Sequence, residues 1–207
     1  MRKWLSPLIL ALIPGGACLT AYTQPTPAPQ ARSTAPEYDA KGSLKLPTGF
    51  RTWVFAGADL GLRYHKDVPD AKARERDRPK TDKPGEFHNV YIQPDAYEHY
   101  RKTGKFPDPT VLVMEVFEAT ERDAKGIVSG GYFPGARRRV EVAVKNSKRP
   151  DGSKTDWAYY DFDTPKKATA SAFRDAACYD CHLKHADVDN VWVQFYPTLR
   201  SRSDEKP

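Results

Sequence analysis

Four kinds of feature are scarce or absent in this chain of 207 residues, and they limit the classes of protein to which it can belong. It has only three cysteines, which excludes a framework of several disulfides. It has no apolar run of the about 20 residues that a membrane-spanning helix needs. It has no internal repeat, and its net charge of +6 is spread along the chain without a basic stripe, so we expect no nucleic-acid partner.

The N-terminus has the layout of a secretory signal. Basic residues precede a short apolar stretch over 5–14, and small residues suited to peptidase cleavage follow it. We therefore predict a signal peptide over residues 1–22, export to the periplasm and no membrane span. A lipoprotein with a lipid anchor at Cys18 stays open as an alternative, and that form is exported too.

Composition divides the remainder of the chain. Residues 23–42 are rich in proline and alanine and lack the apolar residues of a core, which predicts a flexible linker. Residues 43–202 have the length and composition of one domain, and residues 203–207 form a short tail.

Apolar periodicity predicts an α+β domain that is mainly antiparallel sheet with a few helices. Strands are expected over residues 87–93, 110–119 and 157–162, with a hairpin formed by 126–133 and 137–146. Helices are expected over 94–102, with Gly104 as the stop, and over the alanine-rich residues 166–177. Residues 50–56 and 191–199 are ambiguous between strand and short helix.

The cysteines that the exported domain retains lie in one motif. Cys178 and Cys181 are followed by His182 in the order C-x-x-C-H, which is the pattern of c-type haem attachment. Two thiols at this spacing add to the two vinyl groups of haem, and the next residue is carried under the iron as its ligand. A structural zinc site would need a second ligand pair that the chain lacks, and a dithiol redox motif belongs in a βαβ context. We predict one covalent haem c per chain, at a C-terminal helix.

Several stretches together resemble the cytochrome P-460 and cytochrome c′-beta superfamily. They include FRTWV from Phe50, YEHYRKTGKF from Tyr97, the dipeptides Val144-Lys145 and Trp157-Ala158, and the tail FYPTLR from Phe195. The resemblance covers nearly the whole domain. It implies a mainly antiparallel β fold, a five-coordinate haem and a homodimer.

The superfamily that the chain resembles contains two functional types. The P-460 enzymes oxidise hydroxylamine and carry a bond from a lysine to the haem ring, whereas the c′-beta proteins lack this bond and bind nitric oxide and carbon monoxide. Aligned by eye, the cross-linking lysine falls at Met114, which has no amine. The chain thus resembles the methionine variants without a cross-link. Lys145 is the other strand lysine that would need checking.

The same alignment places the distal carboxylate of the P-460 enzymes at Glu141 and their distal-strand arginine at His88. Leu112 and Met114 share one face of a strand by alternation, so they are expected to line the haem pocket. Glu141 and His88 are candidate acid/base residues, because a carboxylate or a neutral imidazole beside bound peroxide can move protons. On the pattern alone, Met114 is equally a core residue, Glu141 a solvated carboxylate and His88 a surface histidine.

These residues leave three functions open. The first is redox chemistry on small nitrogen or peroxide species, peroxidase-like rather than efficient hydroxylamine oxidation. The second is binding of nitric oxide or a similar gas, as in cytochrome c′-beta. The third is electron transfer with Met114 and His182 as axial ligands. Each implies a small ligand or a redox partner protein.

Overall fold

The computed structural model describes residues 35–63, 85–121, 130–152, 154–163 and 167–200, and the structural statements below concern those residues. They belong to one compact unit, Ala31–Pro207. The predicted signal peptide, most of the predicted linker and residues 203–207 lie outside the described residues. At the described end of the linker, Tyr38 forms an antiparallel bridge with Leu44. None of the helices in these ranges has the length and apolar character required to cross a membrane.

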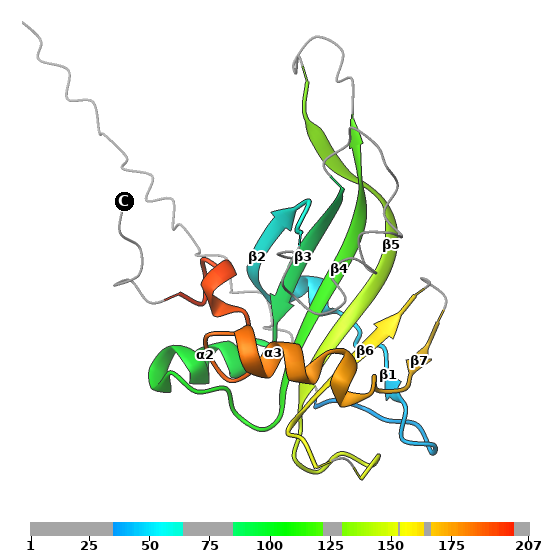
Figure 1. The fold of residues 1–207 in the computed structure, drawn as a ribbon, viewed down its shortest axis with the longest axis vertical. Helices are drawn as coiled ribbons and strands as arrows, with labels where there is room; N and C mark the ends of the chain where they lie inside the picture. Colours follow the sequence, from blue (N-terminus) through cyan, green and yellow to red (C-terminus); the bar gives the residue numbers. More distant parts are fainter. Residues whose placement is uncertain (1–34, 64–84, 122–129, 153, 164–166, 201–207) are drawn as a thin grey trace, which may run out of the picture. The chain divides into compact units, whose positions relative to one another are not determined.

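Five strands of the described chain form one antiparallel sheet, and strands that follow each other in sequence are neighbours in space (Figure 1). The strands are β2 (Val54–Leu60), β3 (Glu86–Ile92), β4 (Thr110–Glu121), β5 (Tyr132–Lys145) and β6 (Trp157–Phe162). Two short strands, β1 (Leu44–Lys45) and β7 (Thr169–Ala170), form a second antiparallel pair. The predicted α+β class with a mainly antiparallel sheet is confirmed, as are the strands expected near 87–93, 110–119 and 157–162.

Two α-helices and three 3-10 turns complete the described elements. They are α2 (Pro94–Thr103), α3 (Tyr179–His185), η1 (Phe50–Thr52), η2 (Asp175–Ala177) and η3 (Val193–Phe195). Helix α2 begins at proline because the first turn needs no N–H from that residue. It ends where Gly104 takes φ 69° and its amide donates to the carbonyl of Tyr100 at 2.8 Å. The helix predicted over 94–102 is therefore confirmed.

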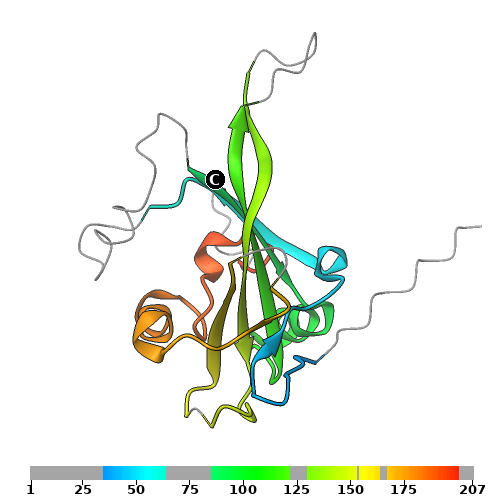
Figure 2. The same ribbon diagram turned by 90° about the vertical axis from the view of Figure 1, so that its right-hand side faces the viewer.

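Alternate side chains of the five-stranded sheet point to opposite faces, and each face is covered by a cluster of buried residues. On one face, Val140, Val142 and Val144 pack with Leu44 and Phe50. On the other face, buried side chains of the sheet pack with those of α2 and of the C-terminal segment. The sheet contributes Val90, Ile92, Leu112, Trp157 and Tyr159, and the C-terminal segment contributes Val191 and Leu199. Figure 2 shows α3 on one side of the sheet and β1 on the other. We call the side that carries α3 the α3 face.

The predicted hairpin of 126–133 with 137–146 is wrong, because residues 132–145 form the single strand β5, which pairs with β4. Residues 126–129 lie outside the described residues. The Pro134-Gly135 pair suggests a turn, but Pro134 pairs with Ala119 inside the ladder. Gly135 marks a close approach instead: a Cβ there would lie 2.0 Å from the Oγ1 atom of Thr120.

The predicted helix over 166–177 is also wrong in its described part. Local alanine content favours a helix, but the backbone finds partners in distant strands. Ala170 pairs with Leu44, and the amide of Phe173 donates to the carbonyl of Tyr159 at 2.8 Å. Only the 3-10 turn η2 forms before Cys178. Of the ambiguous segments, 50–56 forms η1 and the start of β2, and 191–199 forms η3 with flanking turns.

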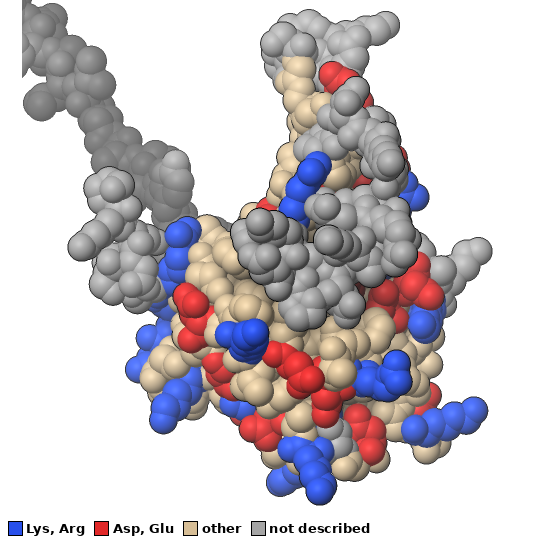
Figure 3. Space-filling view, viewed as in Figure 1, with Lys and Arg blue, Asp and Glu red and all other residues tan. Residues whose placement is uncertain are grey.

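Charged side chains of both signs lie interspersed over the described surface that includes α3 (Figure 3). Several form ion pairs along the sheet, among them Arg138 with Glu118 at 3.2 Å. On the other face of the sheet the buried carboxylate of Glu115 accepts from the exposed Arg51 at 2.6 Å and from the half-buried Arg137 at 3.1 Å.

Candidate functional site

Cys178 is the N-cap residue of α3, and the rest of the C-x-x-C-H motif forms the first part of the helix. The amide of His182 donates to the carbonyl of Cys178 at 3.0 Å, which is a helical hydrogen bond. Residues three and four positions apart lie on the same side of a helix. Cys181 and His182 therefore lie on the side of Cys178. Both cysteines are half-buried and neither forms a disulfide.

The imidazole of His182 is held in one tautomer by two partners of opposite kind. Its Nδ1 atom lies 2.8 Å from the carbonyl oxygen of Asn190, which only accepts hydrogen bonds. The Nε1–H group of Trp192 lies 3.1 Å from the Nε2 atom, and an indole N–H only donates. The proton of the neutral ring is therefore on Nδ1, and the lone pair of Nε2 accepts from Trp192. This is the form in which a histidine ligates iron. An iron would bind Nε2 in place of the indole N–H group.

Aromatic rings on two sides fix the plane of that imidazole. The ring of Tyr159, from β6, lies 4.3 Å from the His182 ring, and the ring of Trp192 lies 4.9 Å from it. The hydroxyl of Tyr159 donates to the carbonyl of Asn190 at 3.3 Å. Burial raises the pKa of Tyr159, so this hydroxyl keeps its proton. The sheet thus supplies one wall of the histidine's surroundings.

The sheet residues singled out from the sequence lie on the same α3 face. Leu112 is buried there, Met114 is half-buried against the same cluster, and Cys178 packs into that cluster from the C-terminal segment. In the sheet register, Met114 lies between Val90 of β3 and Glu141 of β5. The structure therefore brings Leu112, Met114 and Glu141 to the side of the sheet that carries the motif.

His88 lies on this face too, because it alternates with Val90 and Ile92 along β3. Its side chain is 8% exposed, and its Nδ1 atom lies 2.9 Å from a carboxylate oxygen of Asp59 on β2. Since a carboxylate accepts, Nδ1 donates. The Nε2 atom is buried and has no hydrogen-bond partner among the described residues. His88 is thus a buried histidine with a fixed ring orientation rather than a surface histidine.

Glu141 is ion-paired, which neither the pattern nor the family resemblance indicates. Its Oε1 atom accepts from the Nε atom of Arg139 at 2.7 Å, and its side chain is 36% exposed. The same arginine lies 3.2 Å from Glu86. Burial alone would lower the pKa of Arg139, but the charges and hydrogen bonds of Glu141 and Glu86 outweigh it and raise that pKa. Arg139 is therefore a permanent cation beside the carboxylate.

Asp161 is a carboxylate on the α3 face that the sequence analysis did not single out. It is the direct register partner of Glu141 on β6, and its Oδ1 atom is buried without a hydrogen-bond partner in the described structure. Burial raises the pKa of Asp161, and the negative charge of Glu141 adds to the effect. Alternation along WAYYDF could have revealed it, because Asp161 shares a face with Trp157 and Tyr159.

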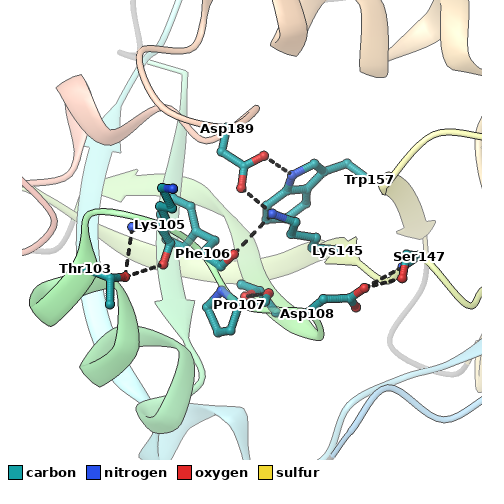
Figure 4. Close-up of polar contacts among 10 residues, drawn as sticks. Thr103, Lys105, Phe106, Pro107, Asp108, Lys145, Ser147, Trp157 and Asp189 are labelled. Atoms are coloured by element: carbon teal, nitrogen blue, oxygen red, sulfur yellow. Dashed lines mark hydrogen bonds and ion pairs between the residues drawn. The ribbon is translucent and has the colours of Figure 1, made fainter.

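Lys145, the other lysine considered for a cross-link, is engaged elsewhere. Its Nζ atom lies 2.6 Å from Asp189 and 3.1 Å from the carbonyl oxygen of Phe106, to which it donates (Figure 4). The ammonium group of Lys145 therefore binds the loop that follows α3, through Asp189.

An imidazole with a fixed tautomer beside two thiols, on an apolar sheet face, is the arrangement that a haem-binding domain requires. The donor set thus fits a haem. A family model described as Cytochrome P460 matches residues 47–193, a range that includes β2 to β6 and the whole C-x-x-C-H motif. The chain belongs to the cytochrome P460 family, which implies a haem cofactor and a small-molecule ligand at its iron. A search among curated proteins found no match.

Proposed function

We propose that the protein is an exported mono-haem c-type cytochrome in which Cys178 and Cys181 hold the haem and His182 binds the iron. Each S–H group adds across one vinyl group, so that sulfur bonds to one carbon and hydrogen to the other. The observation that carries the proposal is that His182, with its proton held on Nδ1 by the Asn190 carbonyl, lies on the same helix side as both thiols. When bound, the haem supplies an iron centre that binds small ligands and exchanges electrons.

The proposed reaction is redox chemistry on small nitrogen or peroxide species, peroxidase-like rather than efficient hydroxylamine oxidation. Met114 and Leu112 would line the distal side without a cross-link, since a thioether has no amine. Cleavage of a peroxide needs a group that takes the proton from one oxygen and returns it to the other. The free Nε2 of His88 and the carboxylate of Glu141 are the groups proposed for that transfer.

A gas-binding function is the second candidate, and a specific observation favours it. Leu112 and Val116 are buried and Met114 is half-buried on one row of β4, which makes the centre of the α3 face apolar. An apolar distal wall suits nitric oxide. In this role the protein would bind the gas without turnover and would need no proton transfer by His88.

The attachment is tested on the purified exported protein. Haem that stays with the chain after denaturation, and is lost only when Cys178 and Cys181 are both changed to alanine, supports the proposal. Haem that leaves the denatured wild-type chain would contradict it. Changing His182 to alanine is expected to alter the absorption spectrum of the iron, whereas changing the exposed His185 leaves it as it is.

Function is then separated by the resting spectrum and by ligands. A high-spin ferric spectrum with peroxide turnover supports the enzyme. A high-spin spectrum with nitric oxide binding but no turnover supports the gas-binding role. A low-spin spectrum that depends on the Met114 sulfur would instead make the protein a Met/His electron carrier.

Location and assembly belong to the same proposal. The predicted signal peptide implies the periplasm, with a lipid anchor only if Cys18 is the processed terminus. The family resemblance implies a homodimer and, for electron supply, a redox partner protein. Fractionation of cells and light scattering of the holoprotein test these two points.

A further inference from the structure

The loop after α3 contains a turn that non-glycine residues seldom adopt. Asp189 and Asn190 have φ values of 47° and 63°, the only positive φ values of non-glycine residues in the described ranges. The amide of Val191 donates to the carbonyl of Val188 at 2.8 Å, which closes the turn around them. Such a conformation persists where surrounding contacts hold it.

The contacts that hold the turn come from two neighbouring strands of the sheet. The carboxylate of Asp189 accepts from the Nζ atom of Lys145 at 2.6 Å and from the Nε1 atom of Trp157 at 3.1 Å (Figure 4). Lys145 and Trp157 are direct register partners at the paired ends of β5 and β6. The side chains of Lys145 and Asp189 are 17% and 31% exposed, and Trp157 is buried. One carboxylate is thus held at both oxygens.

The turn delivers one group to the site. The residue after Asp189 is Asn190, whose carbonyl oxygen lies 2.8 Å from the Nδ1 atom of His182. Because the two residues are adjacent in a closed turn, fixing Asp189 fixes the direction of that carbonyl. The side chain of Asn190 also donates to the carbonyl of Tyr179 at 3.5 Å, which joins the turn to α3.

We propose that Lys145, Asp189 and Trp157 act as positioning residues for the iron ligand, by aiming the Asn190 carbonyl at Nδ1 of His182. This inference rests on the proposed role of His182. A carbonyl that accepts a hydrogen bond from the Nδ1–H group raises the electron density at Nε2. The imidazole is then a stronger electron-pair donor to iron. A stronger donor stabilises ferric over ferrous iron. The three residues therefore hold the reduction potential down without touching the iron.

The sharpest variant is Asp189→Asn in the holoprotein, because asparagine also tolerates the left-handed region while the charge is lost. We expect the reduction potential to rise and the iron–histidine stretching vibration to move to lower frequency. Lys145→Met should shift both in the same direction, and Lys145→Arg should restore most of the wild-type values. Lys148→Met, at an exposed lysine just beyond β5, is the matched control and should change neither.

The outcomes separate this inference from the proposed function. If His182→Ala leaves the iron coordination unchanged, the proposed ligand is wrong. If His182 is the ligand, but Asp189→Asn and Lys145→Met lower only the melting temperature and leave the potential and the vibration unchanged, the network is merely structural and the positioning role is wrong. If Asp189→Asn does not accumulate, Lys145→Met removes the same ion pair and decides the question.

Discussion

Met114 and Glu141 are direct register partners across β4 and β5, at the centre of the sheet face that carries α3. A flexible thioether and a carboxylate that is ion-paired to Arg139 therefore lie side by side in the row. On one side of them is Val90 and on the other is Asp161. The row passes from apolar on β3 and β4 to acidic on β5 and β6.

Met114→Leu tests whether Met114 lines the site or ligates iron. Leucine keeps the apolar volume and removes the sulfur, and such exchanges usually cost less than about 1.5 kcal/mol of stability. We expect the ferric spectrum and the affinity for nitric oxide to stay within about twofold of the wild type, because the proposed role is lining. A change of spin state in this variant would show that the sulfur is bound to iron.

His88→Gln tests the proposed proton transfer. General acid/base groups contribute about 10²–10⁴-fold to rate, so peroxide turnover with a one-electron dye should fall at least about 100-fold. Asp59→Asn should reduce turnover less, because it removes the partner that orients the ring and leaves the ring in place. His99→Gln, on the exposed side of α2, is the control. Equal rates in all three variants would leave His88 without a catalytic role.

Asp161→Asn is expected to stabilise the protein at neutral pH. Burial and the charge of Glu141 raise the pKa of Asp161 in the folded state above its unfolded value, so the folded state binds more protons in the interval between them. Wild-type stability therefore falls as pH rises through this interval. Thermal unfolding should show a higher Tm for the variant at pH 7 and no difference below the ordinary aspartate pKa of about 3.9.

The control for that prediction is Asp163→Asn, which changes an exposed carboxylate on the same segment. It should leave Tm nearly unchanged at both pH values. A gain for Asp161→Asn that persists undiminished in acid would mean that ionisation is not its cause.

Gly135→Ala is expected to destabilise the β4–β5 ribbon. The added Cβ would lie 2.0 Å from Oγ1 of Thr120 and 3.1 Å from the carbonyl oxygen of Glu118, and overpacking of this kind costs about 1–3 kcal/mol. Gly130→Ala is the matched control, because no atom of the described residues beyond its chain neighbours lies within 4 Å of its added Cβ. Chemical denaturation measures both. Combining Gly135→Ala with Thr120→Ala should recover part of the loss, and no recovery would argue against the steric cause.

The parts of the fold that could be predicted from the sequence are those determined by short-range patterns. Alternation of Val140, Val142 and Val144 gives the orientation of β5, and Pro94 with Gly104 gives the ends of α2. The failures depend on distant partners. Alanine content could not reveal that Ala170 pairs with Leu44, since the pairing joins residues far apart in the chain.

The candidate site divides in the same way. The C-x-x-C-H motif is local and is visible at once, whereas the surroundings of each distal residue depend on strand register. Register decides that Glu141 faces Asp161, and neither strand read by itself contains this information. The turn at Asp189 is the extreme case: its conformation is imposed by Lys145 and Trp157, which come from two other strands.

The order β2–β3–β4–β5–β6 also has a consequence for how the molecule assembles. Each strand pairs with the next one along the chain, so the five-stranded sheet forms through contacts between segments that are neighbours in sequence. Bringing such segments together costs little loop-closure entropy. The segment with Cys178, Cys181 and His182 comes after the last of these strands. We therefore expect the sheet to fold first and to act as a template on which the C-terminal segment docks late.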